Sequence, residues 1–233
     1  MNTLNKVIKE LMSMEDKASA EHCLRFFKCG KGEYGEGDMF LGLTSPQIKA
    51  ISKKYYNTLT LAEIEKLLQN KYHDARAAAL SMLVERFEKG IDTKKIFNLY
   101  LKNVSYINNW DLVDISCYKI VGRFVYENKC YSVLDKLANS GHLWSERIAI
   151  VSNMYLIKRG EFAKIKEFAV KFINHKHDLI HKAVGWLLRE MGKKDEVELC
   201  VFLDKYAKKM PRTALRYAIE KFTPERRKHY MTK

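Results

Sequence analysis

Proline is scarce in this sequence, and the few prolines are placed where helices can begin. Pro46, Pro211 and Pro224 are the only ones in 233 residues, and each can stand in the first turn of a helix, where its missing N–H is not needed. Between them the apolar residues recur with a period of 3.6, as in the segment 61–68. The expected N-caps are Thr44, Thr60, Thr93 and Thr223. Because no segment alternates convincingly as a strand would, we expect an all-α fold.

Long apolar runs are also missing. No stretch reaches the roughly 18 apolar residues that a membrane-spanning helix needs. The first 17 residues carry charges where a secretory signal peptide would be apolar. These features argue against a membrane-embedded or secreted protein, and we expect a cytoplasmic location.

Paired cysteines and metal-ligand spacings are absent from the sequence. The five cysteines are odd in number and contain no Cys-x-x-Cys pair, so free thiols are expected rather than a disulfide framework or a zinc site. Of the seven histidines only His175, His177 and His181 cluster, with Asp178 as the sole carboxylate beside them. Such a group is more typical of a surface than of a metal site, and we expect no metal.

Acidic residues are too few to balance the basic ones. Lys and Arg number 42 against 28 Asp and Glu, which gives a formal net charge of +14 and a pI near 9.4. A chain of this charge favours a polyanionic partner. Nucleic acid is the first candidate and a membrane surface the second, while a role as a protein-interaction scaffold is disfavoured.

Glycine is concentrated in one place. Five of the 11 glycines, at positions 30, 32, 35, 37 and 42, lie in a short segment that interrupts the helical pattern. This density predicts a loop whose backbone needs positive φ angles or approaches another segment closely. A nucleotide-binding loop is a poor alternative, because no strand precedes the segment.

A short motif recurs along the chain. A basic residue lies one or two positions before each of four alanines, Ala78, Ala149, Ala183 and Ala214. The last three alanines are separated by about 30 to 35 residues, and Ala78 lies about twice that distance before Ala149. This spacing predicts one helical-repeat domain over residues 1–233, a HEAT-like solenoid with a concave basic groove. Equivalent helices would then line the groove with Arg76, Trp110, Asp114, Arg147, Lys182, Trp186 and Arg212.

The segment 108–114 places an aromatic ring beside a carboxylate. Trp110 and Asp114 are four residues apart, so on a helix they share one face. The ordinary interpretation is that Trp110 anchors the core and that Asp111 or Asp114 is a cap or a solvated residue. The functional interpretation, in which both face a ligand, depends on the other segments of the chain.

Those segments resemble a known family. They are Tyr34–Asp38 with Phe40–Gly42, Asn109–Asp114, Trp144–Arg147 and Ala183–Glu190. Together, from about Glu10 to about Phe222, they are similar to the bacterial AlkD family of DNA alkylation repair proteins. The resemblance implies a HEAT-like solenoid that acts on double-stranded DNA, without a cofactor and as a monomer, as a glycosylase removing N3- and N7-alkylated purines.

The resemblance also implies roles for individual residues. Asp114 matches the catalytic carboxylate, Trp110 and Trp186 match the flanking aromatic residues, and Arg147 matches the phosphate-binding arginine. Phe26 stands where active members carry a tyrosine near the DNA backbone, so a hydroxyl donor is lost. Further DNA contacts are expected from Lys182, Arg76 and Arg212. Some relatives bind DNA without excision, which leaves a non-catalytic solenoid for branched or damaged DNA as the alternative.

The chemistry can be argued from the residues themselves. An alkylated purine is already cationic, so its glycosidic bond can break without a general acid. A carboxylate beside the sugar can stabilise the oxocarbenium-like species and orient a water. Two indoles can add cation–π attraction, and a guanidinium can hold phosphate oxygens. Neither a metal nor a cofactor is needed, and base flipping stays undecided.

Overall fold

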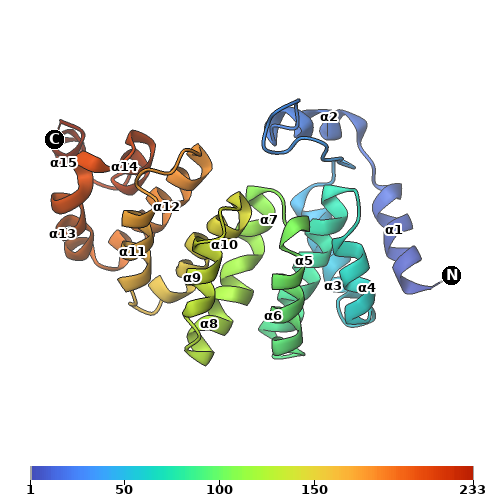
Figure 1. The fold of residues 1–233 in the computed structure, drawn as a ribbon. Helices are drawn as coiled ribbons and strands as arrows, with labels where there is room; N and C mark the ends of the chain where they lie inside the picture. The colour runs from blue at the N-terminus through green and yellow to red at the C-terminus, as the bar shows by residue number, and fades with distance from the viewer. Residues whose placement is uncertain (1, 233) are drawn as a thin grey trace. The chain divides into compact units, whose positions relative to one another are not determined.

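The computed structural model describes residues 2–232 as helices joined by loops (Figure 1). The chain divides into two compact units, one ending at Ile120 and the next beginning at Val121. The range 2–232 contains no strand, only an isolated bridge between Met39 and Tyr72. The all-α, helical-repeat fold expected from the sequence is therefore confirmed. A single domain over the whole chain stays a prediction, and each unit is described by itself.

The first unit is built around one long buried helix. Its elements are α1 (Thr3–Ser13), α2 (Lys17–Phe26), α3 (Ser45–Tyr55), α4 (Leu61–Leu68), α5 (His73–Glu88), α6 (Thr93–Lys102), a short 3-10 turn (Val104–Tyr106) and α7 (Trp110–Cys117). Helix α5 contacts α3, α4, α6 and α7. Its small residues Ala77, Ala78 and Ala79 are almost fully buried, which lets neighbouring helices approach its backbone. Beyond α7 the chain runs through a π-helical turn (Tyr118–Gly122).

The second unit is also built from helices packed around long buried ones. Its elements are α8 (Arg123–Asn128), α9 (Ser132–Ala138), α10 (Leu143–Ile157), α11 (Ala163–Lys171), α12 (Asp178–Lys194), α13 (Glu196–Tyr206), a 3-10 turn (Ala207–Lys209), α14 (Arg212–Ala218) and α15 (Pro224–Thr232). Helix α10 contacts α8, α9, α11 and α12, and α12 contacts α13 and α14. The buried helices α10 and α12 form the core of this unit.

The helix starts follow the signals in the sequence. Thr60 caps α4 in a capping box, accepting from the backbone of Glu63, and Thr44 precedes α3 with Pro46 in its first turn. Pro224 begins α15. The expectation at Thr93 is one residue off, because Asp92 occupies the N-cap of α6. Within residues 2–232, the helices are too short or too polar to cross a membrane.

Candidate functional site

The glycine-rich segment between α2 and α3 is a loop folded tightly against its neighbours. Gly42 has a φ of 81°, and a Cβ there would lie 2.4 Å from the carbonyl oxygen of Asp16. A Cβ on Gly35 would lie 2.5 Å from the carbonyl oxygen of Phe27. Both close approaches exclude a side chain. The expectation of positive φ or close backbone contact is confirmed.

The first turn of α5 holds this loop in place. The carboxylate of Asp74 accepts hydrogen bonds from the backbone N–H groups of Leu41 (2.7 Å) and Leu43 (2.8 Å). The backbone N–H of His73 donates to the carbonyl of Met39 at 2.7 Å. Because these groups are buried, each pairing satisfies a donor that would otherwise be costly to desolvate. The loop is thereby fixed to the N-terminus of α5.

A buried charge cluster joins the loop, α5 and α7. The two ring nitrogens of His73 face Asp38 Oδ2 at 3.0 Å and Asp111 Oδ2 at 2.8 Å. Arg76 Nη2 donates to Asp38 Oδ1 at 2.6 Å and to Asn108 Oδ1 at 3.0 Å. A histidine that faces a carboxylate on each side can donate to both only as the imidazolium. The cluster therefore connects three segments through two cations and two carboxylates.

The surroundings set the protonation states in this cluster. Burial alone would lower the pKa of His73, but the charge of Asp111 and hydrogen bonds to Asp111 and Asp38 raise it to about 9. Burial alone would raise the pKa of Asp38, yet the hydrogen bond from His73 and the charge of Arg76 bring it below its usual range. At neutral pH His73 is thus a cation and Asp38 an anion.

Aromatic rings surround the imidazolium and extend to Trp110. Phe27 and Phe40 lie against His73, with ring centroids 5.1 and 4.6 Å from it. Phe27 also contacts Trp110 at 5.5 Å. Phe26 meets Trp110 edge to face at 5.8 Å. These contacts form a continuous aromatic wall, from the exposed ring of Phe26, which is 54% accessible, to the buried histidine.

The wall forms one side of a pocket in the first unit, with a volume of about 640 Å³. Helix α7 contributes Trp110, Asp111 and Asp114 to the lining. Asn109 precedes this helix as its N-cap. The lining also includes Ala77 and Ser81 of α5 and Lys49, Lys53 and Lys119. The pocket therefore combines an aromatic face with five carboxylates and three lysines, of which Lys49 and Lys53 are exposed. A lining this rich in carboxylates is suited to a cationic group.

Comparison with known proteins identifies the family of this chain. Residues 7–222 match the family model described as DNA alkylation repair enzyme. The chain belongs to this family. Among solved structures it is similar to "Predicted DNA alkylation repair enzyme from Enterococcus faecalis", with a TM-score of 0.74 and 16% identity over 91% of this chain and 98% of that chain. Since the identity is so low, this likeness shows the fold alone. A search of curated proteins gives no match.

The first unit brings together three of the residues singled out in this member of the DNA alkylation repair family. Phe26 ends α2, Trp110 begins α7, Asp114 lies one turn further on, and all three line the pocket. Arg76 also lies in the first unit. It is 4% exposed, and it donates to Asp38, to Asn108 and to backbone carbonyls. Both of its Nη groups are thus engaged inside the protein, and its DNA contact stays a prediction.

The other singled-out residues lie in the second unit. Arg147 on α10 is 4% exposed and donates to the carbonyl of Leu179 at 2.6 Å, so its phosphate contact stays a prediction. Trp186 on α12 is half-buried, and Lys182 one turn before it pairs with Asp178 at 2.8 Å. Arg212 at the start of α14 is exposed.

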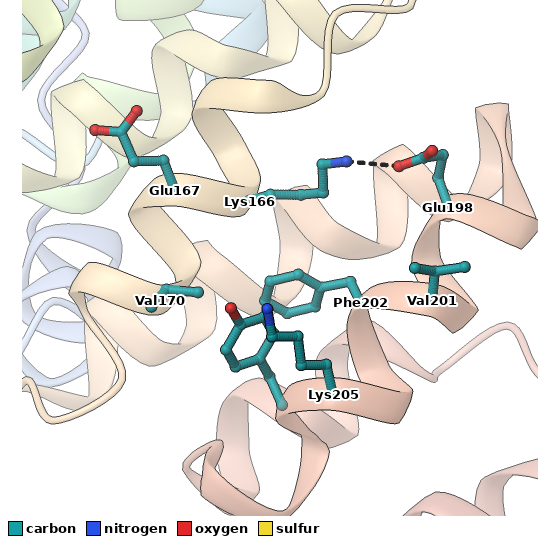
Figure 2. A pocket seen from close by; sticks show the side chains of 8 residues that line it. Lys166, Glu167, Val170, Glu198, Val201, Phe202 and Lys205 are labelled. Carbon is teal, nitrogen blue, oxygen red and sulfur yellow. Dashed lines mark hydrogen bonds and ion pairs between the residues drawn. The ribbon is translucent and has the colours of Figure 1, made fainter.

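A second hollow, of about 420 Å³, lies between α11 and α13 (Figure 2). Phe202 and Val201 line it, and Lys166 pairs with Glu198 at 2.6 Å across it. None of the residues expected to be functional lines this hollow. The candidate site is therefore the pocket of the first unit.

The pocket contains neither an activated thiol nor, among residues 2–232, a set of side chains arranged to hold a metal. Cys23 lines it, but burial and the charges of Asp74 and Asp111 raise the pKa of the thiol. The thiol is therefore protonated at neutral pH and a poor acceptor for an alkyl group. Residues 2–232 contain no group of three His, Cys, Asp or Glu side chains arranged to hold a metal. Asp114 lies in the lining together with the aromatic residues Phe26 and Trp110.

The charge cluster was not predicted from the sequence. Asp111 was interpreted as a cap or solvated residue, and His73 was not singled out. A signal was present, because His73, Asp74 and Arg76 alternate in charge at a helix start. Such an alternation at a buried helix end calls for partners from elsewhere in the chain.

Proposed function

We propose that this protein is a DNA glycosylase that releases N3- and N7-alkylated purines from duplex DNA. The observation that carries the proposal is the placement of Asp114 beside the Phe26–Trp110 wall in one pocket. Membership of the DNA alkylation repair family supports alkylated DNA as the substrate. The net charge of +14 supports a polyanionic partner.

The chemistry follows from the charge of the substrate. An alkylated purine leaves as a neutral base, so the protein need not protonate it. As the bond to the sugar stretches, positive charge develops on the sugar, and the Asp114 carboxylate stabilises that charge. The same carboxylate orients the attacking water. The indole of Trp110 attracts the cationic species through its face.

The exposed lysines of the pocket supply contacts to the DNA backbone. Lys49 and Lys53 project from α3 into the lining. Lys182 and Arg212 are the candidates in the second unit. Contacts of this kind position the duplex but carry no base information. Recognition of the lesion therefore depends on the aromatic wall and the carboxylate.

The decisive experiment uses duplex DNA that contains N7-methylguanine and measures the released base. The Asp114→Asn variant keeps the side-chain volume and removes the charge. We expect its excision rate to fall by about 10²–10³, as for the loss of one electrostatic stabiliser, while DNA affinity is retained or increases. Equal rates for the wild type and the variant would contradict the proposed role of Asp114.

One observation favours the alternative of a non-catalytic DNA-binding protein. Phe26 has no hydroxyl to donate to a phosphate, although its ring is exposed. If the wild type binds alkylated duplex and releases no base, the alternative is the better description. In that case Asp114→Asn produces only a modest gain in affinity.

A further inference from the structure

The position of Trp110 and Asp114 depends on the first turn of α7. Trp110 is the first residue of this helix, and Asp111 follows directly. The contact between Asp111 Oδ2 and His73 Nε2, at 2.8 Å, fixes that turn to α5. His73 is 4% exposed, so solvent has little access to the imidazole side of this hydrogen bond.

A second connection reaches the same turn from the glycine-rich loop. Asp38 of the loop contacts His73 Nδ1 and Arg76 Nη2, and Arg76 also holds Asn108, two residues before Trp110. A third runs through the rings, because Phe27 contacts both His73 and Trp110. His73 takes part in the first two of these connections through hydrogen bonds and in the third through ring stacking.

We infer that His73 is a positioning residue: its doubly hydrogen-bonded ring, held between Asp38 and Asp111, fixes the start of α7 and thereby orients Trp110 and Asp114 in the pocket. The effect of His73 on excision rests on the proposed function, whereas its effect on the position of Trp110 rests on the geometry alone. His73 itself is not assigned a contact with substrate. It acts on α7 directly through Asp111, and on Asn108 through Asp38 and Arg76.

The test combines kinetics with a direct view of Trp110. The chain has three tryptophans, so 5-fluorotryptophan labelling gives a small set of ¹⁹F resonances, and Trp110→Phe assigns one of them. The variants are His73→Gln, Asp111→Asn and the double variant. His229→Gln is the matched control, because His229 is exposed on α15 in the second unit.

We expect His73→Gln to shift or broaden the Trp110 resonance and to leave Trp144 and Trp186 unchanged. Excision should lose about tenfold or more in kcat, because small misplacements of reacting groups are costly, while KM for duplex changes little. Since His73 and Asp111 share one hydrogen bond, the loss in the double variant should be clearly smaller than the product of the two single losses. His229→Gln should match the wild type.

Three outcomes overturn the inference. The first is an unchanged Trp110 resonance in His73→Gln. The second is a double variant whose loss is the product of the two single losses. If His73→Gln fails to fold, the Asp111→Asn variant takes its place in the test. The third outcome is an unperturbed Trp110 resonance in Asp111→Asn. If the wild type shows no excision, the proposed function fails, and the ¹⁹F result still decides the role of His73.

Discussion

The stability of the first unit should depend on pH through His73. The pKa of this group is raised from 6.5 to about 9 in the folded protein. Below pH 6.5 the imidazole is protonated in both the folded and the unfolded chain, so the stabilisation is fully present. As the pH rises through about 9, the folded protein also loses the proton, and the stabilisation disappears.

The magnitude follows from the size of this shift. From 6.5 to about 9, at about 1.4 kcal/mol for each pH unit, the contribution is about 3 kcal/mol. With a urea dependence of about 1–3 kcal/mol/M, the unfolding midpoint should fall by about 1–3 M between low and high pH. The measurement is urea unfolding followed by far-UV circular dichroism at about pH 6 and about pH 9.

The His73→Gln variant isolates this contribution from other titrating groups. The wild type should exceed the variant in stability most at about pH 6, and the difference should shrink towards zero at about pH 9. Asp38, whose pKa is lowered, has the opposite pH dependence. Its contribution to the free energy of unfolding is present at neutral pH and is lost only in acid. A difference between the two proteins that is constant, or larger at about pH 9, would refute a buried imidazolium.

Two further predictions concern the loop and the DNA interface. Gly37 and Gly42 both have a φ of 81°, so alanine at either position should cost about 1–2 kcal/mol of stability in thermal unfolding. Only Gly42→Ala adds the collision with the carbonyl oxygen of Asp16 and should cost more. Equal losses of stability would contradict that close approach. For DNA, Lys49→Ala with Lys53→Ala should make the slope of log K against log salt shallower by about 0.9 for each lost phosphate contact. Lys94→Ala on α6 is the control. If Lys94→Ala changes the salt slope by the same amount, the pocket lysines are not specific DNA contacts.

The helices were predictable because their signals are local. A capping threonine and the glutamate three residues later, as at Thr60 and Glu63, lie within one turn, and both are printed in the sequence. Proline at Pro46 acts in the same way. The glycine-rich loop was predictable for a related reason, since close backbone approach leaves few residues other than glycine possible.

The charge cluster could not be predicted in this way. His73 is 35 residues from Asp38 and 38 from Asp111, and no periodicity connects such positions. Arg76 illustrates the consequence. An arginine on an expected helix face is equally consistent with a phosphate contact and with a buried ion pair, and only the folded position of Asp38 shows that the ion pair is made. The Trp110 and Asp114 pairing was accessible because both residues lie on one helix.

The two carboxylates of α7 in the pocket have different proposed roles, and Asp111 is the one that contacts the buried imidazolium of His73. Every carboxylate at a DNA-binding surface repels phosphate, so an additional negative charge would weaken binding. The imidazolium of His73 compensates the charge of Asp111 and lets that side chain serve as a support. The proposed chemistry needs a negative charge at Asp114, where positive charge develops on the sugar. Replacing His73 should therefore weaken both the support and the charge balance, whereas replacing Asp114 should remove the chemistry and leave the support intact.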